Sequence, residues 1–361
     1  MKILVLTNFG MGLYKFRKEL LEELINQKNE VYISLPNDEY VPKLESLGCK
    51  FVDTHLDRRG TNPFTDLKLL VDYIKIMKRI KPDVVLTYTI KPNVYGGIAC
   101  GITKTPYIAN ITGMGTAVEN KGLIQKITLM LYRLGLKKAS CVFFQNETNR
   151  KFFIDNRIVK TKTRLIPGSG VNLEQHNFEE YLEEDKKINF LFIGRIMKAK
   201  GIEELIQAAK VVKEDYPNVQ FDLIGVSEED YNQQLGELNK LGVIKYHGQQ
   251  EDVHSFIKKS YATILPSYHE GTANVLLESA SSGRPVLASR VPGCIETFDE
   301  DVSGIGFDAK SVKSLVEAII KFINLPYNQK KAMGLAGRKK MEKEYDRKIV
   351  INAYIDEINN L

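Results

Sequence analysis

Short apolar runs alternate with longer amphipathic stretches along the whole chain. In the first half, runs rich in β-branched and aromatic residues occupy residues 2–8, 30–36, 50–55, 83–89, 106–112 and 141–146. Segments with helical spacing of apolar residues, such as 14–27 and 64–80, lie between them. Buried strands separated by helices predict a parallel sheet covered on both faces.

The same pattern begins again after a polar, acidic stretch at residues 179–187. Further strands are expected at 188–194, 219–225, 243–248, 262–267 and 285–289. A chain of 361 residues is also too long for one ordinary core. We therefore predict an α/β protein with two doubly wound, Rossmann-like parallel-sheet domains. Their expected ranges are residues 1–170 and 171–345, and a last helix at 346–361 is expected to pack back on the first domain.

Composition excludes several other classes of protein. Hydrophobic residues make up 43% and charged residues 27% of the chain, which is the balance of a globular protein and not of a disordered one. No uncharged apolar run reaches the roughly 20 residues that span a bilayer. The four cysteines are scattered without metal-ligand spacing, so we expect no disulfide framework, no zinc site and a reducing compartment.

Basic residues are concentrated in the first half of the chain. Residues 1–175 contain 27 Lys and Arg against 16 Asp and Glu, whereas the remainder contains 24 against 29. This asymmetry predicts an anionic partner for the first domain, either nucleic acid or the surface of an acidic membrane.

Two clusters in the second domain have the composition of a binding site. Gly194-Arg195 and Lys200-Gly201 flank a turn from a strand to a helix, where fixed cations and free N–H groups suit a diphosphate. Glu270 follows a later strand, and Glu278 lies in the next helix, so both carboxylates can accept hydrogen bonds from sugar hydroxyls. The alternatives are solvated cations at an ordinary turn and, for Glu270, a carboxylate that interacts with the helix dipole.

These motifs together resemble family 4 of the retaining glycosyltransferases, which have the GT-B fold. The resemblance rests on GRIMKAKG (194–201), on the spacing of Glu270 and Glu278, and on SGRPVLASRVPGCIE (282–296), and it covers essentially the whole chain. Residues 13–17, 62–64 and 111–115 look like the bacterial branch that acts on undecaprenyl-diphosphate-linked sugars. That branch includes capsule and O-antigen enzymes and the N-acetylgalactosaminyltransferases of N-glycan pathways.

The resemblance implies transfer of a hexose or N-acetylhexosamine (GalNAc, GlcNAc or Gal) from a UDP-sugar to an undecaprenyl-diphosphate-linked saccharide. Arg195, Lys200 and Glu270 would be the catalytic residues, with the two cations stabilising the diphosphate leaving group. No metal or other cofactor is expected. The other donor-binding residues implied are Gly194, Tyr246, His247, Gly271, Thr272, Ala273, Asn274, Val275, Leu276 and, for the ribose, Glu278.

The first domain would bind the acceptor and the cytoplasmic face of an anionic membrane. Segment 121–138 contains five cations and no acid, as an interfacial helix does. A mostly buried helix with one solvent-exposed stripe would have a similar sequence. The residues expected to contact the membrane are Lys126, Leu129, Arg133, Leu136 and Lys137. Many relatives have a His where Thr112 stands. The candidates for acceptor binding are Gly12, Tyr14, Arg17, Lys91, Thr112 and Gly113.

Other functions explain less of the sequence. The chain lacks the complete glycine fingerprint of a dehydrogenase. A nucleic-acid-binding function would not explain the charged pairs of the second domain. Asp299–Asp301 lies in an expected surface loop, which argues against a metal-binding DxD motif. The nearest alternative is a UDP-sugar epimerase or hydrolase on the same GT-B fold, which would have no use for a basic, membrane-facing domain.

Overall fold

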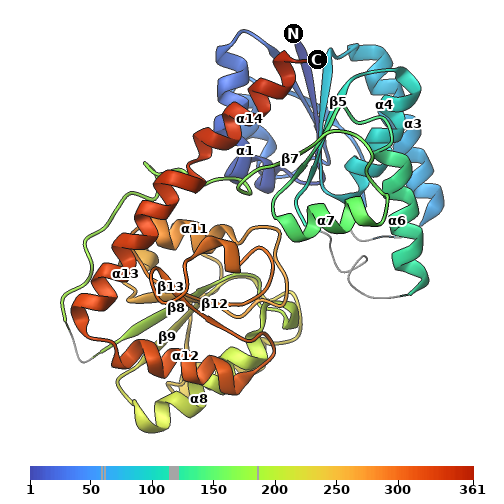
Figure 1. The fold of residues 1–361 in the computed structure, drawn as a ribbon. Helices are drawn as coiled ribbons and strands as arrows, with labels where there is room; N and C mark the ends of the chain where they lie inside the picture. The colour runs from blue at the N-terminus through green and yellow to red at the C-terminus, as the bar shows by residue number, and fades with distance from the viewer. Residues whose placement is uncertain (58–59, 61, 114–121, 185–186) are drawn as a thin grey trace. The chain divides into compact units, whose positions relative to one another are not determined.

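The computed structural model describes residues 1–57, 60, 62–113, 122–184 and 187–361. They form two compact units (Figure 1). Unit 1 comprises Met1–Ser169 and Lys348–Leu361, and unit 2 comprises Gly170–Arg347. The boundary expected after residue 170 lies one residue from this division.

Unit 1 is built on a seven-stranded parallel sheet in the order β3-β2-β1-β4-β5-β6-β7. The chain runs outward from β1 to β3 and then returns to the other side of β1, so the order reverses between β1 and β4. The strands are β1 (Lys2–Leu6), β2 (Glu30–Leu35), β3 (Lys50–Asp53), β4 (Val84–Tyr88), β5 (Tyr107–Ile111), β6 (Cys141–Phe144) and β7 (Thr163–Leu165).

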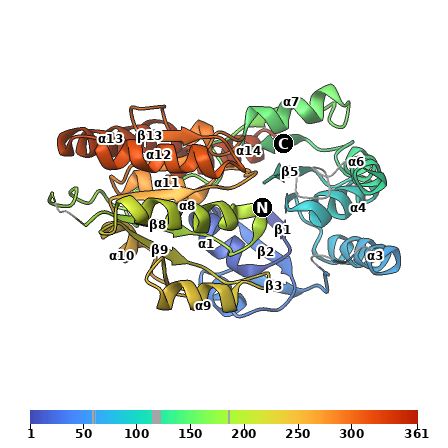
Figure 2. The same ribbon diagram turned by 90° about the horizontal axis from the view of Figure 1, so that it is seen from below.

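Helices cover both faces of this sheet. One apolar core lies under α3 (Pro63–Ile80), the π-helical turn η1 (Pro92–Gly96), α4 (Gly97–Thr103), α6 (Leu123–Gly135) and α7 (Glu147–Asp155). The other core lies under α1 (Gly10–Asn26), α2 (Val41–Ser46) and α14 (Arg347–Asn359). Figure 2 shows α3, α4 and α6 in a row along one side of unit 1.

The last helix, α14, is held in unit 1 by buried polar contacts. Asn110 on β5 donates its amide N–H to the Tyr354 hydroxyl at 2.5 Å. Glu357 is buried and pairs with Lys162 at 2.8 Å and with Arg164 at 3.4 Å. The chain therefore returns to its first unit after completing the second.

Unit 2 has a six-stranded parallel sheet in the order β10-β9-β8-β11-β12-β13. Phe190 on β8 stacks on Phe221 of β9 and packs edge-on against Phe322 of helix α12 (Val312–Asn324), which fixes that helix against the sheet. The strands are β8 (Asn189–Ile193), β9 (Gln220–Ile224), β10 (Lys245–Tyr246), β11 (Ala262–Leu265), β12 (Val286–Ser289) and β13 (Gly304–Phe307).

Figure 1 shows α8 and α12 together on one side of this sheet and α11 on the other. The helices of unit 2 are η2 (Lys198–Lys200), α8 (Ile202–Asp215), α9 (Asn232–Lys240), α10 (His254–Lys258), α11 (Asn274–Ser281), η3 (Ile295–Thr297), α12 (Val312–Asn324), α13 (Tyr327–Lys340) and η4 (Met341–Tyr345).

The predicted fold class, two parallel-sheet α/β domains, is confirmed. Each strand expected from the hydrophobic pattern is present, although most are one to three residues shorter. The pattern missed β7 and β13, because Thr163–Leu165 has only three residues, one of them Arg164, and Gly304–Phe307 contains two glycines. Helix α1 begins at Gly10, four residues before the expected amphipathic segment.

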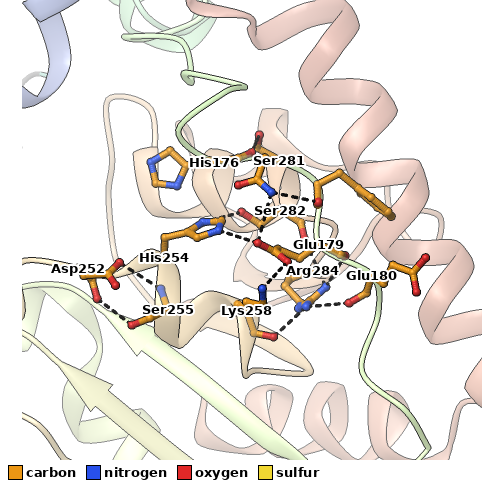
Figure 3. A network of polar contacts seen from close by, with 12 residues as sticks. His176, Glu179, Glu180, Asp252, His254, Ser255, Lys258, Ser281, Ser282 and Arg284 are labelled. Atoms are coloured by element: carbon orange, nitrogen blue, oxygen red, sulfur yellow. Dashed lines mark hydrogen bonds and ion pairs between the residues drawn. The ribbon is translucent and has the colours of Figure 1, made fainter.

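A fully buried arginine anchors the segment that enters unit 2 (Figure 3). The Arg284 guanidinium donates to the carbonyls of Glu179 at 3.0 Å, Glu180 at 3.0 Å and Lys258 at 2.8 Å. Burial lowers the pKa of Arg284, and its hydrogen-bond partners among the described residues are all backbone carbonyls. In the same network His254 bonds to Glu179 at 3.0 Å, so the acidic stretch that begins at residue 179 is held to α10 and not left as a loose linker.

We expect Arg284→Met to lower the free energy of unfolding by about 3 kcal/mol, because several buried carbonyls would lose their donor. Arg290→Met is the matched control, since Arg290 is exposed and pairs with Glu300 at the surface. The control should change the stability by at most about 1 kcal/mol. Urea unfolding followed by circular dichroism measures both values, and equal midpoints would contradict the anchoring role of Arg284.

Candidate functional site

The sheet order of unit 2 reverses between β8 and β11, so the loops that follow these two strands meet at one edge of the sheet. Gly201 allows their close approach. Its φ is +70°, and a Cβ at this position would lie 2.1 Å from the carbonyl oxygen of Pro266. Tyr268 reinforces the contact by donating its backbone N–H to the Ala199 carbonyl at 3.0 Å. Gly194 and Arg195 directly follow β8 on the same loop.

The structure brings two of the predicted catalytic residues into direct contact. The Lys200 ammonium forms an ion pair with the Glu270 carboxylate, and both side chains are largely buried. Ser267 donates its hydroxyl to the same carboxylate oxygen at 2.7 Å. Arg195 lies apart from this pair: its side chain is 52% exposed and pairs with Glu228 at 3.0 Å. The pattern of the sequence did not single out Ser267 or Glu228.

The first turn of α11 lies next to Glu270. Ala273 precedes this helix and has no side chain that caps it, so its first N–H groups are available for an anion. The Oδ1 atom of Asn274 is buried and has no hydrogen-bond partner among the described residues. Gly271, Thr272, Val275 and Glu278 are half-buried, whereas Ala273 and Leu276 are buried and can offer a ligand only backbone.

A second glycine positions the loop that carries Glu270. Gly293 has a φ of +83°, and a Cβ there would lie 2.5 Å from the Glu270 carbonyl oxygen. The Gly293 carbonyl accepts the backbone N–H of Ala273 at 2.8 Å, and the Pro292 carbonyl accepts that of Glu270 at 3.3 Å. The SGRPVLASRVPGCIE segment (282–296) therefore holds the Glu270 loop in place through backbone hydrogen bonds.

The side chains of Tyr246 and His247, the residues predicted beside the base of the donor, already bind partners within the protein. The Tyr246 hydroxyl donates to the Gly225 carbonyl at 2.8 Å, and burial raises the pKa of this phenol. The His247 ring contacts Asp222 at 2.8 Å and packs edge-on against Phe256. Any contact with a base at this position would therefore use backbone atoms.

The candidate acceptor residues of unit 1 fall into different environments. Tyr14 lies in the first turns of α1 and packs against Tyr40. Arg17 is buried, with its guanidinium 5.3 Å from the centroid of the Tyr88 ring, so its position does not favour direct contact with an acceptor. The N-terminus of α1 near Gly12 already holds a carboxylate, because the Gly10 N–H donates to Asp38 at 2.6 Å.

Lys91 follows β4, the strand at which the sheet order of unit 1 reverses. Its ammonium pairs with Asp66 at 2.6 Å and is largely buried. Thr112 and Gly113 follow β5 and are half-buried, whereas Met114 and Gly115 of the same motif lie outside the described residues. Near this edge, Asn8 Oδ1 and Thr89 Oγ1 are buried without a hydrogen-bond partner among the described residues, and no sequence motif marked them.

The membrane contact predicted on segment 121–138 is wrong for one of its five residues, Leu136, which is fully buried. Helix α6 ends at Gly135, and Lys137 is exposed just beyond it. Gly135 fixes this orientation, because a Cβ there would lie 2.6 Å from the Cα atom of Val94. Lys126 and Arg133 are exposed, and Leu129 is partly buried. The exposed apolar side chains of α6 are Leu123, Ile124, Ile127, Met130 and Leu134.

Other kinds of site find no support among the described residues. No group of three or more His, Cys, Asp or Glu side chains in that part of the chain is arranged to hold a metal ion. Burial raises the pKa of all four cysteine thiols, which are free and buried. No helix within the described ranges combines the length and the apolar character needed to cross a membrane.

Comparison with known families gives a match in each unit. Residues 174–340 match the model for glycosyl transferases group 1, and residues 2–146 match the model for glycosyl transferase 4-like proteins. Together the two matches include every predicted donor-binding and acceptor-binding residue.

Two curated relatives act on lipid-linked saccharides. The chain is 28% identical to N,N'-diacetylbacillosaminyl-diphospho-undecaprenol alpha-1,3-N-acetylgalactosaminyltransferase of Campylobacter jejuni, with 98% of this chain and 97% of the relative covered. It is 25% identical to UDP-Gal:alpha-D-GlcNAc-diphosphoundecaprenol alpha-1,3-galactosyltransferase of Escherichia coli, with 73% and 72% covered.

Solved structures share the fold of the whole chain. HepE of Anabaena in complex with UDP-glucose superposes with a TM-score of 0.82 at 18% identity, over 100% of both chains. Sucrose-phosphate synthase of Thermosynechococcus elongatus superposes with a TM-score of 0.80 at 18% identity, over 100% of this chain and 98% of the other. The predicted GT-B fold is confirmed.

We expect Gly293→Ala to destabilise unit 2 and displace the Glu270 loop, because the new Cβ would meet the Glu270 carbonyl. Gly242→Ala is the matched control: its φ is +70°, but nothing lies within 4 Å of its Cβ position. The control should cost only the backbone strain of about 1–2 kcal/mol. Urea unfolding gives the difference, and faster hydrogen exchange at the Glu270 and Ala273 amides should appear in Gly293→Ala alone. Equal behaviour of the two variants would show that Gly293 does not hold the loop.

Proposed function

Because this chain belongs to the glycosyltransferases of the group 1 and 4-like families, we propose that it transfers a hexose or N-acetylhexosamine from a UDP-sugar to an undecaprenyl-diphosphate-linked saccharide. The names of both relatives support the acceptor class, and that of the second also names a UDP-sugar donor. They give GalNAc and Gal as the transferred sugars, and we keep GlcNAc as the third candidate. A role in the assembly of a bacterial surface glycan or a protein-linked glycan follows from that acceptor.

The observation that carries the proposal is the meeting of Lys200 and Glu270 where the sheet order reverses, with Arg195 on the same loop. A carboxylate and two cations at one edge suit two adjacent groups of a nucleotide sugar, the sugar and the diphosphate. Glu270 accepts hydrogen bonds from hydroxyls of the transferred sugar, while Lys200 and Arg195 bind the diphosphate. Binding of the donor would exchange the Lys200–Glu270 and Arg195–Glu228 pairs for contacts with the ligand.

The first turn of α11 completes the donor site. Its N-terminus has no side-chain cap and can bind a phosphate, and the half-buried Asn274 adds a buried Oδ1 atom that can accept a hydrogen bond from a hydroxyl of the donor. Glu278 lies one turn further along the same helix, where we assign it to the ribose hydroxyls. The base would contact backbone near Tyr246 and His247.

The chemistry we propose needs no protein base. An acceptor hydroxyl attacks the anomeric carbon from the face of the leaving group, and the bond from that carbon to the diphosphate oxygen breaks. The hydroxyl proton passes to a phosphate oxygen of the departing UDP, so the configuration is retained. Lys200 and Arg195 stabilise the negative charge that develops on the diphosphate, which is the role a metal ion has in other enzymes.

We also propose that unit 1 binds the acceptor and associates peripherally with an anionic membrane at the cytoplasmic face. The support is the exposed apolar face of α6, with Leu123, Ile127, Met130 and Leu134 at helical spacing and Lys126 and Arg133 beside them. An acceptor anchored in lipid would then be presented to Lys91 and Thr112 at the carboxyl edge of the sheet.

The epimerase or hydrolase alternative fits less well. The two curated relatives described above are both transferases that act on lipid-linked saccharides. An epimerase would also leave the apolar face of α6 without a use.

We expect Lys200→Met to lower kcat/KM for the UDP-sugar by at least about 30-fold, or about 2 kcal/mol of transition-state stabilisation. Lys198→Met is the matched control, because Lys198 lies two residues away, is exposed and pairs weakly with Glu203 at 3.6 Å. Calorimetric titration with UDP, with GDP and ADP as comparison ligands, should give weaker UDP binding in Lys200→Met only. Unchanged turnover in Lys200→Met would remove this residue from the site.

Transfer activity should survive EDTA, because the cations of the protein replace a metal at the diphosphate. The assay measures release of UDP in the presence of the chelator, with a magnesium-dependent glycosyltransferase as the positive control for chelation. Activity that is lost in EDTA and restored by Mg²⁺ or Mn²⁺ would contradict the metal-free mechanism.

A further inference from the structure

One face of the unit 2 sheet is polar where a parallel sheet is normally apolar. Parallel strands are covered on both faces, so their side chains are apolar on both. On β8, β9 and β10 one face follows this rule, because Phe190, Phe221 and Ile244 are buried in the core. The other face carries a polar set at these strands, which we call the polar floor: Asn189, Gln220, Asp222, Lys245 and His247.

A short helix leaves the polar floor uncovered. Helix α10 has only five residues, and its Phe256 and Ile257 pack on Leu191 and Ile224, nearer the carboxyl ends of the strands (Figure 2). Toward the amino ends the same face of the sheet stays open as a cavity of about 660 Å³. Pockets for small ligands enclose roughly 300–1,000 Å³, so this cavity has the size of a binding site.

The pairing of the strands places the polar side chains side by side. Asn189 is in register with Gln220, and Asp222 with Lys245, so the polar floor crosses three strands about 4.8 Å apart. Asp222 is only 8% exposed and contacts the His247 ring at 2.8 Å, which fixes both side chains. The Oδ1 atom of Asn189 is buried and has no hydrogen-bond partner among the described residues. This acceptor suits a donor that a ligand supplies.

Backbone contacts hold the walls of the cavity. Tyr261, which follows α10, donates its hydroxyl to the Glu183 carbonyl at 2.5 Å and its N–H to the Asn189 carbonyl at 2.8 Å. The segment that enters β8 is thereby fixed at one side of the cavity. Leu182 and Phe256 add apolar surface to the lining. The cavity is therefore formed before any ligand binds.

The cavity is separate from the proposed donor site. The donor residues follow the carboxyl ends of β8 and β11, whereas the cavity lies toward the start of β8. The four residue steps from Asn189 to Ile193 span about 13 Å along the strand. Only His247 belongs to both sets, with its side chain in the cavity and its backbone at the predicted position of the base. A donor and a ligand on the polar floor can therefore bind together.

The charges around the cavity favour a neutral ligand. The described lining contains three acids and three lysines, so a phosphate would meet the acids and a cation would meet the lysines. Hydroxyl groups both donate and accept, and a saccharide can therefore satisfy carboxylate, amide and ammonium groups together. The apolar face of a sugar ring suits the Phe256 ring. The charged residues are Glu183, Glu184, Lys187, Asp222, Lys245 and Lys259.

We propose that this cavity is a second carbohydrate site, which binds a neutral mono- or disaccharide on the polar floor. Asn189 and Asp222 accept hydrogen bonds from its hydroxyls, and Lys245 donates to them. A free sugar and a segment of a glycan present the same chemistry to these groups. The inference goes beyond the proposed transfer and does not depend on it, because Arg195, Lys200 and Glu270 are not among the lining residues.

Saturation-transfer NMR on the full chain tests the site. The probes are N-acetylglucosamine, N-acetylgalactosamine, galactose, chitobiose and lactose, each with and without saturating UDP. Transfer of signal to the sugar protons should persist in the presence of UDP, because the nucleotide occupies the other end of the strands. The anionic comparison ligand, N-acetylglucosamine 1-phosphate, should bind at least about threefold more weakly than N-acetylglucosamine, because its phosphate meets the acids of the lining.

Variants locate the bound sugar. Gln220→Trp should lower the sugar affinity at least about tenfold, because the new ring fills the cavity. The matched control is Gln234→Trp, at an exposed position of α9, which should bind as the wild type does. Lys245→Ala removes one donor and should weaken binding about threefold, whereas Lys240→Ala, at an exposed position of α9, should not. Circular dichroism checks the fold, and Lys245→Ala decides if Gln220→Trp does not fold.

Failure of this inference is distinguishable from failure of the proposed function. A wild-type chain that binds none of the five sugars would overturn the inference, while UDP binding would still support the donor site. A sugar that Gln220→Trp and Lys245→Ala bind unchanged lies elsewhere, and its displacement by UDP would assign it to the donor site; either result overturns the inference. A chain that binds the sugars in the cavity but does not bind UDP would support the inference and contradict the proposed function.

The comparison of ligands identifies what the cavity takes. Tighter binding of chitobiose or lactose than of the monosaccharides supports the inference with a glycan segment as the source. Equal or tighter binding of a monosaccharide supports it with a free sugar as the source. Tighter binding of N-acetylglucosamine 1-phosphate than of N-acetylglucosamine would overturn the assignment to a neutral ligand.

Discussion

The reversal of strand order in each parallel sheet is the constraint on which the rest of the structure depends. Parallel strands are joined by crossover connections, so the loops that follow the strands lie at the carboxyl edge of the sheet, and two of them lie side by side where the order reverses. In unit 2 this point lies between β8 and β11, and it places Lys200 against Glu270 across 70 residues of sequence. In unit 1 it lies between β1 and β4, where Lys91 directly precedes the π-helical turn η1 that follows β4.

The charged groups at the reversal in unit 2 neutralise one another in the chain without ligand. A buried lysine or glutamate alone would be costly, and the pair lets both residues stay charged in a partly desolvated site. Gly201 and Gly293 allow the backbone approach that holds the pair, and each stands where a side chain would strike a carbonyl oxygen. In the function proposed above, a nucleotide sugar would replace these internal partners with its own diphosphate and hydroxyls.

The two faces of the sheet in unit 1 are covered by different sets of helices. One face is closed by α1, α2 and the returning helix α14, which is tied down through Tyr354 and Glu357. The other face is covered by α3, α4 and α6, whose inward sides fill the core and whose outward sides expose apolar residues and cations. The cations on these outward sides are Lys68, Lys75, Lys78 and Arg79 of α3 and Lys126 and Arg133 of α6.

The sequence by itself determined the elements, the two-domain division and the motifs at Arg195, Lys200 and Glu270, because hydrophobic period and loop chemistry are local. Only the tertiary structure decided which way a side chain points. Arg17 was expected to face a ligand and packs on Tyr88, and Leu136 was expected at a membrane and is buried. The short strands β7 and β13 also form only because a neighbouring strand is already in place. Helix orientation and short strands depend on partners far away in the sequence, so no local pattern encodes them.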